Sequence, residues 1–259
     1  MDTINAYDFL ALHYNDWQQD FDEDKRTRYL KRLINKHSTS CFRQKKTSEQ
    51  LLCDLGCGTG KTIVSFAADG YSAVGIDISE LMLNIAAETA DCMNVSVVFS
   101  RQDICSFSLP EPAAIIFCLM DTVNHLTAEK NLLRFFRRVN REMLPGGLFI
   151  FDFVTPFYFQ NILSDEVFYF ADEEKALFWQ NHYNEKKKMN SADITMFVQN
   201  ESGFYLRSEV EIRERSYSLE EIKKVLSECR FEICNIYGDL SMKAPKDDEQ
   251  RVFIAAKKI

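Results

Sequence analysis

Residues 51–66, LLCDLGCGTGKTIVSF, place an acid before a glycine-rich turn and end that turn in Gly-Lys-Thr. Glycines let the backbone turn sharply and approach a ligand closely. The helix that follows such a turn offers its N-terminal amides to an anionic group. The segment therefore predicts a binding site for a nucleotide-like ligand.

Two common nucleotide loops fit this segment poorly. A P-loop, Gly-x-x-x-x-Gly-Lys-[Ser/Thr], would need its first glycine at the position of Leu55. Asp54 would also bring a carboxylate close to phosphates, which is electrostatically costly. Because LFIFD, ending at Asp152, resembles the acidic strand of such enzymes, a nucleoside triphosphatase stays open as a minor alternative. A dinucleotide loop, Gly-x-Gly-x-x-Gly, fails at Lys61.

Two further acids follow predicted strands in the same half of the chain. Asp77 ends the second predicted strand, where an acid suits two ribose hydroxyls. Asp103 follows the third predicted strand and can accept a hydrogen bond from an adenine amino group. With Asp54, these residues favour a ligand that carries both a ribose and a base.

Strands and helices alternate around these acids. Apolar runs predict strands at 51–55, 71–76, 95–99, 113–119 and 148–154. Helical periodicity predicts helices at 61–68, from a cap at Ser79 to residue 90, and at 128–143. The run at 113–119 is almost uninterrupted, which is typical of a strand covered on both faces. This alternation predicts a doubly wound α/β sheet.

The pattern changes after residue 154. Long β-like segments at 176–183, 193–199 and 204–217, separated by turn signals, predict an antiparallel β insertion after strand five. A helix at 218–229 and a strand pair at 231–237 and 251–257 follow. We therefore divide the chain into an N-terminal helical cap (1–48), a core (49–154), the insertion (155–217) and a C-terminal segment that completes the core sheet (218–259).

Four motifs in order resemble those of class I S-adenosylmethionine-dependent methyltransferases. CDLGCGTG is similar to their motif I, VGIDIS to their ribose-binding loop, RQDI to their adenine-side motif, and LPGGLFIFDF to their fifth-strand region. The resemblance covers about residues 48–155. It implies a seven-stranded Rossmann-like sheet and S-adenosylmethionine as the cofactor.

The resemblance also implies which residues bind that cofactor. By this likeness they are Tyr14, Asp54, Gly56, Cys57, Gly58, Gly60, Asp77, Ile78, Asp103, Ile104 and Leu119. The acid and glycines of the first motif would surround the methionyl part, Asp77 the ribose, and Asp103 the adenine. The carbonyl near Leu119 would contact the ammonium or sulfonium side. Tyr14 would close over the cofactor, although packing of an amphipathic helix explains its position equally well.

The segment after strand four indicates the class of acceptor. CLMDTVNHL, residues 118–126, lacks the [Asp/Asn]-Pro-Pro-aromatic motif of nucleic-acid and protein-glutamine methyltransferases, and no Pro-Cys nucleophile is present. It resembles the Asp-Ser-Leu-Asn-Tyr-Leu element of bacterial small-molecule methyltransferases, including the sugar N-methyltransferase-like group. His125 replaces the usual tyrosine of that element. The resemblance implies methyl transfer to an N or O nucleophile of a small-molecule acceptor.

His125 is the best candidate for a catalytic base, because imidazole titrates near neutrality and this residue follows strand four. A loop histidine without a proton role is the alternative. In the insertion, Trp179, Tyr183, Arg213 and Tyr217 are candidate acceptor contacts. Strand alternation and cross-strand charge pairing produce the same pattern, so that explanation stays open.

Composition limits the other classes of function. The net charge of −8 disfavours nucleic acid as a partner, because a negative field repels phosphates. The eight cysteines form no Cys-x-x-Cys pair, so we expect reduced thiols and no metal. No apolar run is long enough to span a membrane, and no secretory signal is evident, so we expect a cytoplasmic monomer or homodimer. A cofactor-binding protein without transferase activity is the alternative function.

Overall fold

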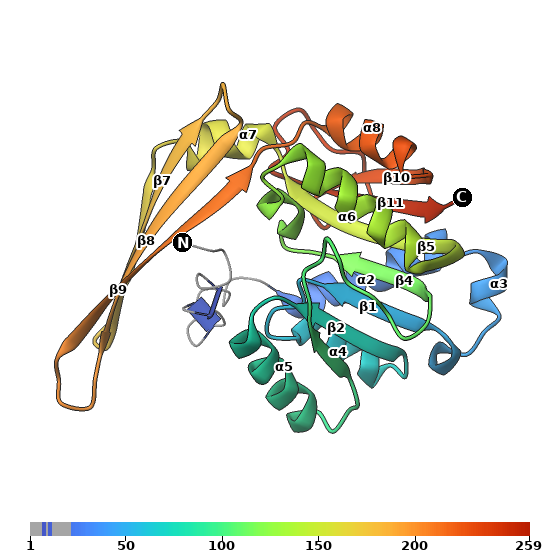
Figure 1. Ribbon diagram of the computed structural model, residues 1–259, viewed down its shortest axis with the longest axis horizontal. Helices are drawn as coiled ribbons and strands as arrows, with labels where there is room; N and C mark the ends of the chain where they lie inside the picture. The colour runs from blue at the N-terminus through green and yellow to red at the C-terminus, as the bar shows by residue number, and fades with distance from the viewer. Residues whose placement is uncertain (1–6, 9, 12–21) are drawn as a thin grey trace.

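The computed structural model describes residues 7, 8, 10, 11 and 22–259, so Tyr14 lies outside the described residues. This part of the chain forms a seven-stranded sheet with helices and a four-stranded antiparallel sheet that projects to one side of it (Figure 1). None of its helices is long and apolar enough to cross a lipid bilayer.

The larger sheet has the strand order β10-β11-β5-β4-β1-β2-β3. Its strands are β1 (Leu51–Leu55), β2 (Ser72–Asp77), β3 (Val98–Arg101), β4 (Ala113–Cys118), β5 (Met143–Val154), β10 (Phe231–Gly238) and β11 (Arg251–Lys258). Strands β1 to β5 pair in parallel, whereas β11 is antiparallel to both of its neighbours. The predicted doubly wound, seven-stranded Rossmann-like sheet is confirmed.

Helices cover both faces of this sheet. They are α2 (Glu23–His37), α3 (Ser40–Arg43), η1 (Thr47–Glu49), α4 (Lys61–Ala68), α5 (Glu80–Cys92), η2 (Thr122–His125), α6 (Glu129–Arg141) and α8 (Leu219–Glu228). The apolar sides of α6 and α8 share one core cluster, and those of α2, α4 and α5 share another. Strand β4 contributes Ile116 to the first cluster and Ile115 to the second. This burial on both faces explains its uninterrupted apolar run.

Several predicted boundaries are wrong. The third strand begins at Val98 rather than at residue 95, and the second ends at Asp77 rather than at residue 76. Strand β5 begins at Met143, before the Pro-Gly-Gly turn signal, because Met143 already pairs with Ala113. Pairing with a neighbouring strand outweighed local turn propensity there.

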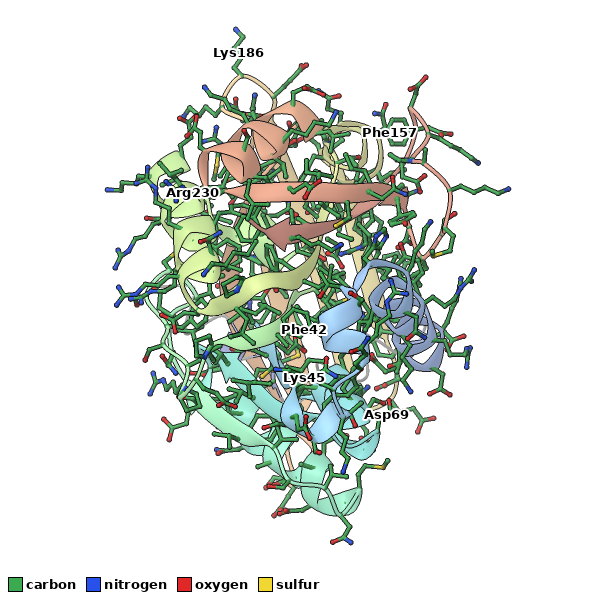
Figure 2. The ribbon with its side chains drawn as sticks, turned by 90° about the vertical axis from the view of Figure 1, so that its right-hand side faces the viewer. Phe42, Lys45, Asp69, Phe157, Lys186 and Arg230 are labelled. Carbon is green, nitrogen blue, oxygen red and sulfur yellow. The ribbon has the colours of Figure 1, made fainter. Side chains whose placement is uncertain are left out.

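The four-stranded sheet follows β5, after α7 (Pro156–Tyr158) and the π-helical turn η3 (Phe159–Leu163). Its strands, in spatial order, are β6 (Val167–Ala171), β7 (Lys175–Asn184), β8 (Met189–Gln199) and β9 (Tyr205–Arg215). The predicted antiparallel insertion after strand five is confirmed. Strand β6 was not predicted, because its five exposed residues show no alternation. Lys186 projects outward from the turn between β7 and β8 (Figure 2).

Asn124 of η2 joins the two sheets. Its fully buried amide donates to the carbonyls of Val154 at 3.2 Å and Arg215 at 2.9 Å, and accepts from the amide of Val154 at 3.0 Å. These two residues end β5 and β9. One side chain therefore satisfies backbone groups at the ends of both strands and holds η2 against them.

We expect Asn124→Ala to lower the free energy of unfolding by on the order of 2–4 kcal/mol, because buried backbone groups would lose their partner. Urea denaturation measures this change. Asn140→Ala is the matched control, since the Asn140 amide makes an exposed contact with the Arg230 carbonyl. Equal, small effects of both substitutions would contradict a joining role for Asn124.

Candidate functional site

A cavity of about 350 Å³ opens at the carboxyl ends of the central strands. Its described lining comes from Tyr7, the glycine turn, α5, the segments that follow β2, β3 and β4, and α6. The lining residues are Tyr7, Gly56, Gly58, Asp77, Ile78, Met82, Asp103, Ile104, Cys105, Met120, Thr122, His125, Leu126, Asn131 and Arg134. The topology thus brings together the predicted ribose and adenine residues and His125.

The glycine turn has a backbone that other residues would strain. Gly56, Gly58 and Gly60 have φ angles of 72°, 51° and 79°. A Cβ on Gly56 would lie 2.7 Å from side-chain atoms of Thr122, and one on Gly60 would lie 2.7 Å from Ala86. Gly56 therefore keeps the cavity open, whereas Gly60 permits α4 and α5 to pack closely.

Asp77 is held in place by the turn it faces. Its carboxylate accepts hydrogen bonds from the amides of Gly58 and Ser79, both at 2.9 Å. Burial raises the pKa of Asp77, and the backbone hydrogen bonds partly oppose that rise. The side chain is thus fixed at the cavity wall with carboxylate oxygens beside the glycine turn.

Asp103 and Ile104 lie at the other end of the same wall. Asp103 accepts a hydrogen bond from the amide of Cys105 at 2.7 Å. Asn131 and Arg134 of α6 complete this end of the cavity. Neither residue was predicted, because polar residues on a helix carry no signal that separates cavity lining from a solvated face.

A smaller hollow of about 40 Å³ adjoins the glycine turn and shares Gly56, Gly58 and Met120 with the cavity. Its lining includes Asp54, Cys57, Leu119 and Arg26. Asp54 and Leu119 were predicted, whereas Arg26 of α2 was missed, because its approach depends on tertiary packing.

Asp54 is 3% exposed, and its Oδ1 has no hydrogen-bond partner among the described residues. Burial raises the pKa of Asp54 to about 7, although Arg26 opposes the rise. Arg26 itself donates to Glu23 and to the sulfur of Met120. A buried acceptor without a donor is costly, so this hollow is suited to a ligand that supplies a positively charged donor.

A buried ion-pair network shapes the segment after β4. The carboxylate of Asp152 is fully buried and accepts from the amides of Met120 at 3.0 Å and Asp121 at 2.7 Å. Arg251 donates to Asp152 at 2.7 Å and to Asp121 at 2.6 Å. Burial opposes the charge of Arg251, but the two carboxylates raise its pKa. The network holds Met120 and Asp121 at positive φ angles of 56° and 54°.

His125 ends η2 and lines the cavity. Its Nε2 lies 2.8 Å from the hydroxyl of Tyr7, within hydrogen-bond distance. Its Nδ1 is buried without a hydrogen-bond partner among the described residues. One ring nitrogen of His125 and one carboxylate oxygen each of Asp121 and Glu214 lie within 4.8 Å of one another.

The four candidate acceptor contacts do not line the described cavity. Trp179 is half-buried and donates to Asn181 at 3.1 Å, while Tyr183 stacks on Phe159 with ring centroids 5.6 Å apart. Arg213 is exposed and pairs with Glu211 at 2.8 Å.

The fourth of these residues, Tyr217, has a supporting position. It is buried, and its hydroxyl donates to the carbonyl of Leu126, which follows η2. The Tyr217 side chain therefore fixes the end of the segment that carries His125.

Comparisons with known proteins agree with this geometry. A family model described as a methyltransferase domain matches residues 52–147. A relative from Geobacillus sp. (strain WCH70), which carries a provisional methyltransferase name, is 31% identical over 210 residues, covering 80% of this chain and 84% of the relative. The chain belongs to the S-adenosylmethionine-dependent methyltransferase family. S-adenosylmethionine is the cofactor of that family.

Two further proteins resemble this methyltransferase. An S-adenosylmethionine-dependent methyltransferase from Clostridium acetobutylicum has a TM-score of 0.83 at 23% identity, covering 98% of this chain and 99% of that structure, which shows the shared fold. A dTDP-4-amino-2,3,4,6-tetradeoxy-D-glucose N,N-dimethyltransferase from Saccharopolyspora spinosa is 29% identical over 116 residues, covering 45% of this chain and 44% of the relative.

The site of this methyltransferase fits that cofactor. The ammonium group of a methionyl tail is the kind of donor that the unpartnered Oδ1 of Asp54 requires. The glycine turn, which lies between Asp54 and Asp77, leaves room for a ligand because it carries no side chains at Gly56, Gly58 and Gly60. The Asp77 carboxylate lies at the cavity wall, where its oxygens are able to accept hydrogen bonds from hydroxyl groups.

The raised pKa of Asp54 has a consequence for stability. Without ligand, the folded protein binds a proton at Asp54 between pH values near 3.8 and about 7, where the unfolded chain has released it. The free energy of unfolding should therefore fall as pH rises through this window. Asp54→Asn has no carboxyl group to lose this proton, so its free energy of unfolding should not fall in this way. The difference between the free energies of unfolding of Asp54→Asn and the native chain should therefore change by about 2 kcal/mol in favour of the variant between about pH 5 and about pH 8.

Urea denaturation at the two pH values measures this difference. Asp69→Asn is the control, because Asp69 pairs with Lys31 at the surface at 2.6 Å. If the native protein and Asp54→Asn show the same pH dependence, Asp54 is ionised in the ligand-free fold and this explanation is wrong.

Proposed function

We propose that this methyltransferase moves a methyl group from S-adenosylmethionine to an N or O nucleophile of a small molecule. The observation that carries the proposal is the continuity of one cavity, with the glycine turn and Asp77 on one side and His125 on another. A cofactor held at Asp77 would face the segment that carries the candidate base.

Bound S-adenosylmethionine supplies a methyl group already activated by a sulfonium centre. The chain therefore has three tasks, which are to align the acceptor, to exclude water and to accept a proton where the nucleophile arrives protonated. Asp54, Gly56 and Gly58 would hold the methionyl tail, and Asp77 the ribose. Ile78, Asp103 and Ile104 would enclose the base.

Two residues missed in the sequence are proposed to hold the same tail. Arg26 and Glu23 of α2 line the hollow beside Asp54. The guanidinium of Arg26 has a buried Nε without a partner among the described residues, which suits the tail's carboxylate. The helix that covers this face of the sheet would thus also contribute to cofactor binding.

His125 is proposed to accept the proton of the acceptor. It lines the cavity, and imidazole titrates near neutrality. Tyr7, at 2.8 Å from Nε2, would fix the ring and cover it. A small acceptor is supported by the limited room that a cavity of about 350 Å³ leaves beside a bound cofactor. The Saccharopolyspora spinosa relative, named for an amino-sugar nucleotide, supports the same class.

Asp77→Ala should weaken S-adenosylmethionine binding by on the order of 1–3 kcal/mol, because hydrogen bonds to a charged group would be lost. Isothermal titration calorimetry measures the affinity. Asp69→Ala is the control, since it removes a surface acid that does not line the cavity. An unchanged affinity in Asp77→Ala would remove this residue from the cofactor site, and stabilisation by ATP-Mg but not by S-adenosylmethionine would favour the triphosphatase.

Turnover separates an enzyme from a cofactor-binding protein without activity. The native chain, given S-adenosylmethionine and a mixture of small amines and alcohols, should release S-adenosylhomocysteine, measured by mass spectrometry. His125→Gln should lower kcat by roughly 10²–10⁴-fold, as expected for loss of a general base, while cofactor affinity stays unchanged. Full activity of His125→Gln would exclude this proton role, and absence of product with every acceptor would favour the binding protein.

A further inference from the structure

A line of buried polar side chains crosses the inner face of the four-stranded sheet. This face is otherwise apolar, with Leu177, Ile194 and Val210 among its buried residues. Asn181 and Asn190 are fully buried in it, and Glu214 of β9 is 5% exposed. Polar groups buried among apolar residues destabilise a fold unless they are satisfied, so their presence needs a reason.

These side chains contact one another in sequence. The amide of Asn190 donates to Asn181 at 3.1 Å and lies 3.4 Å from a carboxylate oxygen of Glu214. Glu214 in turn lies beside His125, with a carboxylate oxygen within 4.8 Å of a ring nitrogen. The line therefore begins inside the sheet and ends at the candidate base in the cavity.

The nearby cations are engaged with other acids. Arg215 pairs with Glu129 at 2.8 Å, and Arg251 pairs with Asp152 and Asp121. Burial raises the pKa of Glu214, and the charge of His125 is the largest influence that opposes this rise. A buried carboxylate in these surroundings is best balanced by a positive charge on the imidazole beside it.

We propose that Glu214 is a positioning residue for His125: its buried carboxylate lies beside the ring, where Nδ1 has no hydrogen-bond partner among the described residues, and it stabilises the imidazolium that forms during the reaction. This inference rests on the proposed function. When the acceptor's lone pair forms its bond to the methyl carbon, the electron pair of the broken carbon–sulfur bond stays on sulfur. The acceptor's proton passes to the His125 ring, and the Glu214 carboxylate balances the imidazolium charge until the proton leaves to solvent.

The charged and titratable groups around His125 come from four parts of the chain. Asp121 lies in its own loop, Glu214 on β9, Arg251 on β11, and Tyr7 covers Nε2. Arg251 donates to Asp121 at 2.6 Å and so neutralises most of its charge. A divalent cation bound by Asp121, His125 and Glu214 would therefore be repelled by the nearby guanidinium. Glu214 is therefore the group that sets the charge beside the ring.

The first test needs no acceptor. The pKa of His125 is followed by NMR in isotope-labelled protein, with the His125→Gln spectrum assigning its signal. Removing the neighbouring negative charge in Glu214→Gln should lower this pKa by about one unit, a tenfold change in proton affinity. Glu209→Gln, an exposed acid on the same strand, is the control and should leave it unchanged. An unchanged pKa in Glu214→Gln overturns the proposal.

A second test uses the reaction. In Glu214→Gln the rising limb of the pH profile of kcat/KM should move to lower pH by the same amount, with a plateau at least tenfold lower, and Glu214→Asp should restore part of the rate. A shifted pKa without any methyl transfer by the native chain would reject the proposed function alone. Methyl transfer with an unshifted pKa would reject the positioning role alone.

Two further measurements apply if Glu214→Gln does not fold or if the site holds a metal ion. If Glu214→Gln does not fold, carboxyl-carbon NMR of the native protein replaces it, and Glu214 should titrate together with His125. Independent titration of the two groups would overturn the proposal. So would activity that is lost with EDTA and restored by Zn²⁺ or Mn²⁺, since the three groups would then hold a metal ion.

Discussion

The site depends on the charge of one buried carboxylate. Asp152 is removed from solvent at the end of β5, and it is satisfied only because two backbone amides and Arg251 surround it. Those amides belong to Met120 and Asp121, which must adopt a left-handed backbone to reach it. The chain therefore turns at the end of β4 instead of extending the strand, and the turn directs η2 and His125 to the cavity.

Acids outnumber cations where the central strands end. Asp54 and Asp77 each lose solvation there, and burial raises the pKa of both. Arg26 offsets part of this charge on one side of the glycine turn, but it is shared with Glu23. An excess of buried negative charge is unfavourable in the empty fold and favourable once a cationic ligand enters. S-adenosylmethionine carries both an ammonium and a sulfonium charge, which explains why this arrangement suits it.

Local sequence determined much of this architecture. The bounds of β1 and α4 follow directly from an apolar run and a glycine turn, and Ser79 caps α5 as its position predicted. Contacts between distant segments could not be predicted in the same way, because no local period encodes them. Arg26 contacts Met120 across 94 positions, and its place beside Asp54 follows from the packing of α2 on the sheet. Sequence motifs thus predicted more of the described cavity lining than of the residues that pack around it.

The alternation of residues along β9 contained a signal for a buried acid that was not used in the prediction. Its charged residues Glu209, Glu211 and Arg213 alternate along the outer face, as expected for a solvated strand. Residues of the opposite parity must then face inward, and Glu214 is the acid among them. Asn124 fixes the end of this strand to η2, so the inner acid and His125 keep one geometry. Asn124 thus joins the insertion to the core, and a change in the register of β9 by one residue would move Glu214 away from His125.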